Sequence, residues 1–166
     1  MKTIQLTHGK KVIVDDEDFK YLNRFHWTLN KSNKNFTVAK TFSKNKISVS
    51  IAMWKFIICG ENNKEIVYKN RNSLDCRKEN MVLVPTYIAN HCSSKKIRGV
   101  NGTPTSKYKG VSYASTYAGK KKWVAAIQAN GKVFTKHLFS EKEAALVYNE
   151  KAHELYGDIA FQNIIE

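Results

Sequence analysis

Residues 122–143 read KWVAAIQANGKVFTKHLFSEKE, and this stretch carries two strands, a turn and the start of a helix. Asn130-Gly131 lies between two runs rich in apolar and β-branched residues, 123–128 and 132–139, and predicts a two-residue hairpin turn. Ser140 with Glu143 forms a capping box, which predicts a helix from there to Gly157. The stretch therefore predicts an antiparallel hairpin followed by one helix.

A third strand is predicted just upstream, over Tyr108 to Tyr113, which makes a three-stranded antiparallel sheet packed on one helix. Alternation along the second and third strands is expected to turn Val124, Ala126 and Phe139 to the core and polar or basic groups to the other face. The helix carries an apolar stripe at helical spacing, formed by Ala144, Tyr148, Ala152 and Leu155.

The charge of the chain points to a polyanionic partner. Its 166 residues hold 28 Lys and Arg against 14 Asp and Glu, a formal net charge of +14. Residues 93–140 contain ten of the basic residues and no acidic one, whereas the predicted helix contains four glutamates. Nucleic acid is therefore the expected partner, contacted by the sheet and not by the helix.

Other compartments and partners are not indicated. No apolar run approaches the roughly 18 residues of a spanning helix, no basic amphipathic helix is evident and no signal peptide opens the chain, so we expect a cytoplasmic protein that does not bind membranes. The cysteines Cys59, Cys76 and Cys92 are an odd number, which does not indicate a disulfide framework.

The first 92 residues predict a separate module of short strands and helices. Ile4–Leu6 and Lys11–Val14 are expected to form a hairpin, followed by a helix capped by Asp15 or Asp16. Further expected elements are strands at His26–Leu29 and Phe36–Phe42 and a helix over Ile51–Ile58. With a basic linker at 93–106 and a second domain at 107–166, the chain is predicted to be α+β.

The second domain resembles the AP-two (APETALA-two) domain of plant ethylene-response factors and phage endonucleases. The resemblance rests on residues 108–111, 122–127 and 143–148, with Gly157 and Asn163. It implies a sheet in the major groove of double-stranded DNA, although Lys and Ser stand where the plant proteins favour Arg, which weakens guanine reading and favours phosphate contacts. The contact residues that it implies, with the neighbouring lysines, are Lys107, Lys109, Ser112, Lys120, Lys121, Lys122, Trp123, Gln128, Lys132 and Lys136.

The first module looks like an HNH homing endonuclease of the phage type, on residues 53–57, 66–70, 74–81 and 88–90, and such modules have a ββα core. The metal-binding Asp, the water-activating His and the Asn of that family fall on Val67, Tyr68 and Ala89. None of these can do the same chemistry, so catalysis by the ordinary mechanism is not expected. The remaining positions of the degenerate nuclease site are Trp54, Asp75, Asn80 and Asn90.

No metal or cofactor is expected. His91, Cys92, Cys76 and Cys59 lack the short spacings that pre-organise a zinc site, and no nucleotide-binding or triad motif appears.

Three hypotheses follow. The leading one is a catalytically inactive relative of HNH homing endonucleases that binds double-stranded DNA. The second is a phage-type inhibitor or interaction module that binds a host nucleic-acid enzyme through an exposed patch around Trp54, Phe56, Val67 and Tyr68. The third is an HNH nicking endonuclease with a relocated active site that uses Asp75, Asn80, Asn90 or His91.

Overall fold

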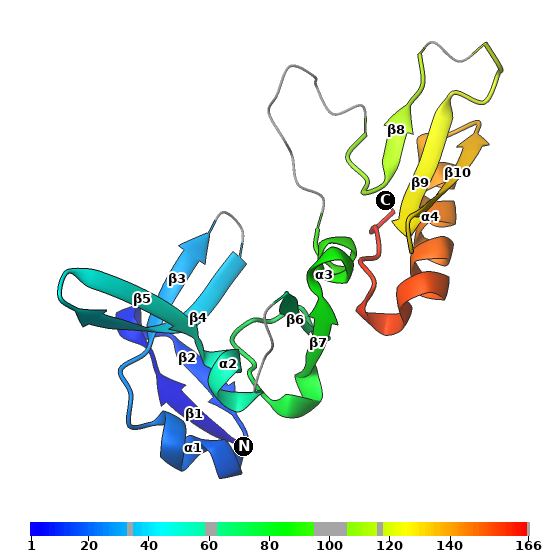
Figure 1. Ribbon diagram of the computed structural model, residues 1–166. Helices are drawn as coiled ribbons and strands as arrows, with labels where there is room; N and C mark the ends of the chain where they lie inside the picture. The colour runs from blue at the N-terminus through cyan, green and yellow to red at the C-terminus, as the bar shows by residue number, and fades with distance from the viewer. Residues whose placement is uncertain (33–34, 59–62, 95–105, 116–117, 166) are drawn as a thin grey trace. The chain divides into compact units, whose positions relative to one another are not determined.

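The computed structural model describes residues 1–32, 35–58, 63–94, 106–115 and 118–165. The chain is α+β, as predicted, and divides into two compact units, Met1–Thr86 and Tyr87–Glu166 (Figure 1). Most of the expected linker at 93–106 lies outside the described residues, and the predicted domain limits stay a prediction.

The first unit contains small antiparallel sheets. β1 (Lys2–Gln5) pairs with β2 (Lys11–Val14), which confirms the first predicted hairpin, and α1 (Asp16–Leu22) follows. A second sheet has the order β3-β4-β5, and the last one pairs β6 with β7. The bounds of the remaining elements of this unit are β3 (Thr28–Ser32), β4 (Asn35–Lys44), β5 (Ile47–Ala52), α2 (Met53–Ile57), β6 (Lys64–Tyr68), β7 (Met81–Pro85), and short 3-10 turns at Thr7–Gly9 and Lys78–Asn80.

Several details of the first unit differ from the predictions, and the strand expected at His26–Leu29 is β3 at Thr28–Ser32. The helix expected over Ile51–Ile58 begins only at Met53, because the alternation Ile47-Ser48-Val49-Ser50-Ile51 has the period of a strand and pairs with β4. Asp15 is the N-cap residue of α1, but its side chain makes no capping hydrogen bond. It accepts a hydrogen bond from the backbone N–H of Lys78 instead, at 2.8 Å.

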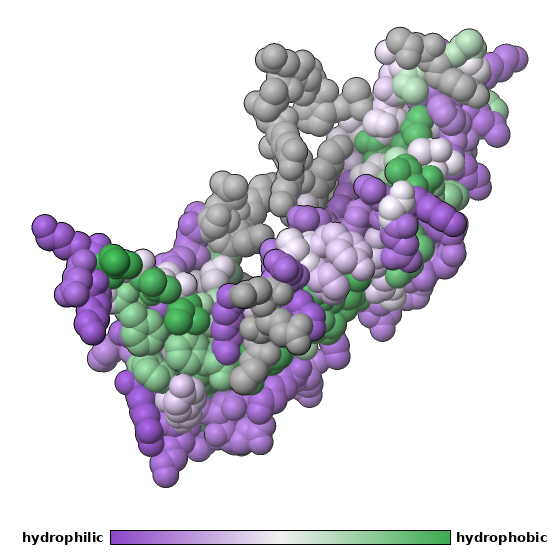
Figure 2. Space-filling model, viewed as in Figure 1, coloured by the Kyte–Doolittle hydropathy of each residue, from purple (hydrophilic) through white to green (hydrophobic). Residues whose placement is uncertain are grey.

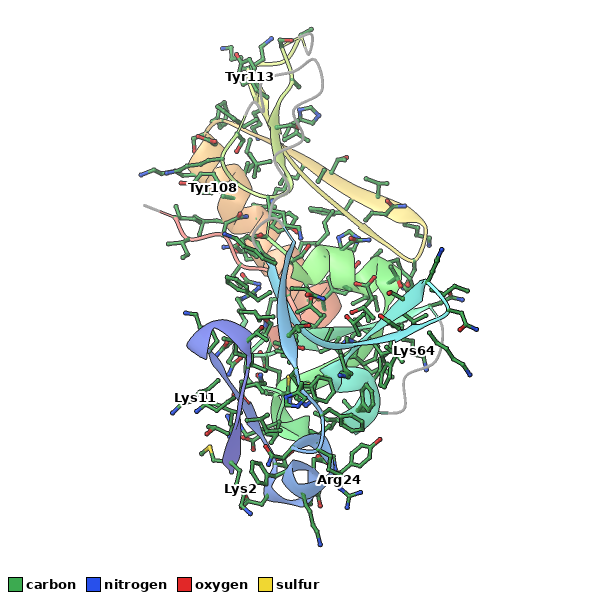
Figure 3. All side chains as sticks on the ribbon, turned by 90° about the vertical axis from the view of Figure 1, so that its left-hand side faces the viewer. Lys2, Lys11, Arg24, Lys64, Tyr108 and Tyr113 are labelled. Carbon is green, nitrogen blue, oxygen red and sulfur yellow. The ribbon has the colours of Figure 1, made fainter. Side chains whose placement is uncertain are left out.

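Hydrophilic side chains cover much of the surface that Figure 2 shows, and Lys2 and Lys11 lie on the β1–β2 hairpin (Figure 3).

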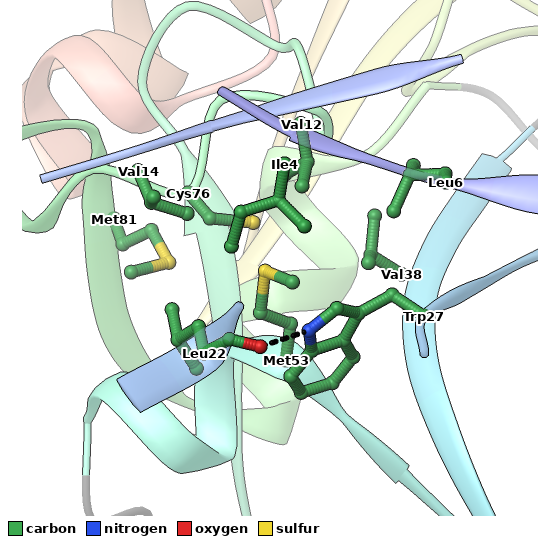
Figure 4. Close-up of a cluster of buried hydrophobic side chains, with 10 residues drawn as sticks. All are labelled: Ile4, Leu6, Val12, Val14, Leu22, Trp27, Val38, Met53, Cys76 and Met81. Carbon is green, nitrogen blue, oxygen red and sulfur yellow. Dashed lines mark hydrogen bonds between the residues drawn. The ribbon is translucent and has the colours of Figure 1, made fainter. Parts of the chain in front are cut away.

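The core of the first unit gathers around Trp27, Leu22 and Met53, whose surfaces are almost completely buried (Figure 4). The indole Nε1–H of Trp27 donates to the carbonyl oxygen of Leu22 at 2.8 Å. This bond satisfies the polar atom that a buried tryptophan brings into a core.

The second unit contains the sheet that the sequence predicts. Its strands run in the order β10-β9-β8, and α4 lies behind them in Figure 1. The predicted capping box is confirmed, since Ser140 accepts from the Glu143 N–H and Glu143 reaches back to the Ser140 N–H. The elements are α3 (Thr86–Cys92), which begins at the last residue of the first unit, β8 (Val111–Tyr113), β9 (Trp123–Ala129), β10 (Lys132–Leu138), α4 (Glu141–Tyr156) and a 3-10 turn at Gly157–Ile159.

Candidate nucleic-acid interface

The face of the sheet that packs on α4 is set by the odd-numbered residues of β9. Ala125 is fully buried and Ile127 is 4% exposed. The helix turns Ala144, Ala145, Tyr148 and Ala152 toward them, and these small side chains let α4 lie close to the sheet.

The predicted assignment of strand faces is therefore wrong. Val124 and Ala126 alternate with the buried residues and point to the other side, and Phe139 is 63% exposed just beyond β10. The physical reason is that the bulky Trp123 and Ile127 lie on the same face of β9 as Ala125, so burying that face removes more apolar surface from water.

The opposite face of the sheet, which we call the open face, exposes mainly polar side chains together with Val133. Residues directly opposite each other in an antiparallel pair share a face. The register pairs Ser112 and His137 with Val124, pairs Thr135 with Ala126, and pairs Val133 with Gln128. Ser112, Gln128, Thr135 and Val133 are exposed, and His137 is half-buried. The open face thus presents two hydroxyls, an amide and an imidazole beside small apolar groups.

Two of the predicted DNA contacts, Ser112 and Gln128, lie on this open face. Lys132 and Lys136 lie on the helix side of the sheet, because they are directly opposite Ala129 and Ala125. They are nevertheless exposed, because β10 is an edge strand. Trp123 also belongs to the helix side, where it is half-buried against the core.

The predicted contacts ahead of β9 form a basic run. Lys120 and Lys121 are exposed, and the ammonium of Lys121 lies 5.0 Å from the centre of the Phe139 ring. Lys122 is half-buried, and its ammonium donates to the carbonyl oxygen of Ser115 at 3.4 Å. Lys107 is exposed at the start of the described stretch 106–115, with its ammonium over the ring of Tyr108.

Lys109 has a structural role that sequence reasoning missed. Its ammonium donates to the carbonyl oxygens of Asn90 at 2.8 Å, His91 at 2.9 Å and Ser93. These are carbonyls at the C-terminal end of α3, where a cation is favoured by the helix dipole. The ring of His91 also stacks on that of Tyr156, with centres 5.1 Å apart. Lys109 therefore holds α3 within the second unit.

The tail of the chain fixes the start of the sheet. The buried Asn163 accepts from the backbone N–H of Lys109 at 2.7 Å and donates to its carbonyl at 3.1 Å. Asn149 on α4 binds the backbone of Asn163 in turn. These bonds connect helix, tail and first strand.

Two positions that the sequence analysis predicts for a degenerate nuclease site, Asp75 and Asn80, are part of a closed hydrogen-bond network. Arg77 binds Asp75 in a bidentate pair with distances of 2.8 and 2.7 Å, and Asn70 donates to the same carboxylate at 2.8 Å. The bonds from Arg77 hold the pKa of Asp75 below its usual value. Asn80 is buried and joins the Asp75 carbonyl to the Asn70 N–H.

Tyr68, which the sequence analysis predicts at the position of a nuclease base, is unsuited to proton transfer near neutral pH. Its hydroxyl lies 4.0 Å from the Cys76 thiol, and burial raises the pKa of the tyrosine far above its ordinary value. Burial also raises the pKa of Cys76 to about 12. Neither group ionises at pH 7.

The other positions predicted for a nuclease site lie in three different elements. Val67 is half-buried in β6 opposite Val82, and Trp54 packs on the core of the first unit from α2. Ala89 and Asn90 belong to α3 in the second unit. Among the residues that the structure describes, no three His, Cys, Asp or Glu side chains gather where they could hold a metal ion.

No helix in the described ranges is long and apolar enough to cross a membrane. Comparison of the chain with protein-family models, curated proteins and solved structures found no match.

Proposed function

We propose that this chain binds double-stranded DNA through the open face of β8-β9-β10 and does not cleave it. The observation that carries the proposal is the two-sided sheet. One face packs on α4, and the other exposes Ser112, Gln128 and Thr135 within a stretch of the chain that has no acidic residue. Side chains of these types bond to base edges and phosphate oxygens, and a small sheet fits the major groove.

Electrostatics support the same reading. Lys120 and Lys121 are exposed just ahead of β9, where they can neutralise phosphates while the open face meets the groove. The four glutamates of the helix lie on α4, which covers the other face of the sheet. The chemistry of the sheet's two sides thus favours one orientation on a polyanion. The resemblance to the AP-two domain adds weight to this orientation.

The altered nuclease positions support the proposed loss of cleavage. Tyr68 stays protonated near neutral pH and so offers no phenolate to accept a proton, and Asp75 is held by Arg77. The alternative of a protein-interaction patch around Trp54, Phe56, Val67 and Tyr68 gains no support, because these four side chains are all half-buried.

A salt series on the whole chain tests the proposal. Retention of duplex DNA is expected to fall steeply with salt, because each neutralised phosphate releases counterions. Lys120→Gln with Lys121→Gln should make the negative slope of log K against log salt less steep by about 2. Gln128→Ala with Thr135→Ala should weaken binding without changing that slope. Lys142→Gln on α4 removes an exposed charge from the helix side and serves as the control.

The same samples are incubated with Mg²⁺ or Mn²⁺ and resolved on a denaturing gel, where intact strands are expected. Nicked strands would contradict the proposed loss of cleavage. Absence of DNA retention at low salt would contradict the proposed binding.

A further inference from the structure

The first unit contains a second basic segment without acidic residues, and it surrounds an exposed hairpin. Between Phe19 and Gly60 the chain has eight Lys and Arg and no Asp or Glu. β3, β4 and β5 lie within this segment. Its position is separate in sequence from the acid-free stretch of the second unit, so it is an independent observation.

The hairpin of β4 and β5 extends beyond the core. Every residue from Thr41 to Ser50 is exposed, and the turn at Asn45-Lys46 has two positive φ angles, 50° and 64°. Two consecutive positive φ angles are what a tight type I′ hairpin turn requires. The result is a two-stranded ribbon with a defined register.

The two faces of this ribbon differ in chemistry. On one face Ser43 pairs with Ser48 at 2.8 Å and Thr41 with Ser50 at 3.4 Å, so the hydroxyls satisfy one another. The other face, which we call the lysine–apolar face, carries Lys40, Phe42, Lys44, Ile47 and Val49.

Apolar side chains on the lysine–apolar face are exposed to an unusual degree. The exposed fraction is 42% for Phe42, 53% for Val49 and 69% for Ile47. Figure 2 shows the corresponding green patch over the β4–β5 hairpin, bordered by hydrophilic purple. The ammonium of Lys40 lies 5.9 Å from the Phe42 ring centre. Within the described ranges, no ion pair engages Lys40, Lys44 or Lys46.

We infer that the β4–β5 hairpin is a second DNA contact, which inserts its lysine–apolar face into a groove of the duplex. This inference rests on the proposed function. A two-stranded ribbon fits the major groove, where apolar side chains contact thymine methyl groups and sugars, while lysines reach the flanking phosphates. Charge selects this partner, since the acid-free segment repels a second copy of the chain and attracts a polyanion.

Separate variants of the whole chain test the lysines of the hairpin and the apolar side chains of the lysine–apolar face. Lys44→Gln with Lys46→Asn, in which Asn tolerates the positive φ of the turn, should lower the slope of log K against log salt by about 2. Ile47→Ser with Val49→Ser should weaken DNA retention roughly tenfold at every salt concentration with an unchanged slope, because only apolar burial is lost.

Matched controls come from the same unit. Lys10→Gln with Lys11→Gln removes two exposed charges from the first hairpin, where acidic residues follow closely in the chain. Ser43→Ala with Ser48→Ala alters the opposite face of the same ribbon. Both pairs should bind DNA like the unmodified chain. All substituted side chains are exposed, so melting curves should be unchanged, which separates a binding effect from unfolding.

Failure of this inference is distinguishable from failure of the proposed function. If the unmodified chain retains DNA with a steep salt slope and the hairpin variants behave identically to it, the hairpin is not a contact and the open-face proposal stands. If no form retains DNA, the proposed function itself falls. If the hairpin variants lose retention by anionic lipid vesicles but not by DNA, the hairpin's partner is a membrane and the inference is overturned.

Discussion

Gly110 provides the sharpest test of how the second unit is packed. Its φ is +69°, and a Cβ atom built there would lie 2.1 Å from the Cδ2 and Cε2 atoms of Tyr148 and 2.7 Å from the Ala126 carbonyl oxygen. Tyr148 is 2% exposed, so its ring has no free space into which it can move. The substitution Gly110→Ala therefore forces the chain at the start of β8 away from α4.

The expected cost has two parts. An alanine in the left-handed region costs about 1 kcal/mol, and overpacking a closed core costs about 1–3 kcal/mol. We expect a loss of about 3 kcal/mol in the free energy of unfolding of the second unit. A unit of this size has a total stability of roughly 4–12 kcal/mol. Its melting temperature should therefore fall by about 12–24 °C.

Gly131→Ala is the matched control. Gly131 has a similar φ of +74°, but a Cβ atom there would have nothing within 4 Å. Only the conformational cost remains, about 1 kcal/mol or a shift of roughly 4–8 °C. Scanning calorimetry, with amide hydrogen exchange of α4 to assign the transition, measures both. If Gly110→Ala melts within a few degrees of Gly131→Ala, the close approach of β8 and Tyr148 is refuted.

Three other predictions concern single interactions. Ser140→Ala removes the oxygen that accepts from Glu143 N–H, and it should lower the free energy of unfolding of the second unit by about 1 kcal/mol in denaturant titrations. Lys109→Met should lower the melting temperature of the second unit while leaving the salt slope of DNA retention unchanged, because its ammonium already bonds to the carbonyls of α3; a smaller slope would make Lys109 a phosphate contact. The lowered pKa of Asp75 stabilises the first unit at pH values above 3.8, the ordinary pKa of this group, and the stabilisation is lost as the pH falls through the lowered pKa. Asp75→Asn should therefore be less stable at neutral pH, and its melting temperature should depend less on acid pH. An unchanged acid dependence would show that the pair with Arg77 contributes nothing.

The hairpin and helix of the second unit could be predicted because their signals are local. Asn130 and Gly131 both have positive φ, as the turn motif requires, and the capping box marks the first residue of α4 within one position. Each signal depends on residues that are neighbours in the chain. Such signals do not depend on how the rest of the molecule packs.

The choice of buried face failed because it requires comparing whole strands. Ala125 and Ala126 are identical side chains on opposite faces of β9, so alternation alone does not show which of the two faces is buried. Trp123 and Ile127 share the parity of Ala125 and together could have decided it. The turn also fixes Thr135 opposite Ala126, and this pairing could have identified Thr135 as an open-face residue.

The role of Lys109 could not be predicted from composition. Its partners are backbone carbonyls 16–19 residues earlier, in an element whose sequence carries no signal for that contact. A lysine in an acid-free stretch predicts a phosphate contact on charge alone. The same reasoning applies to any cation that a fold uses to satisfy a helix end, since the sequence shows the charge but not the acceptor.

The donor set around Asp75 supports the proposal that this chain binds DNA without cleaving it, because the carboxylate is already engaged by Asn70 and Arg77. Both lone-pair directions of its Oδ2 atom are used, one by Asn70 and one by Arg77, and Oδ1 accepts from the Arg77 Nε–H. A divalent ion would have to displace the guanidinium and approach a positive charge that is 2.7 Å from the carboxylate. Val67 and Tyr68 offer neither a metal ligand nor a base at neutral pH, and the loop that contains Asp75 joins β6 to β7.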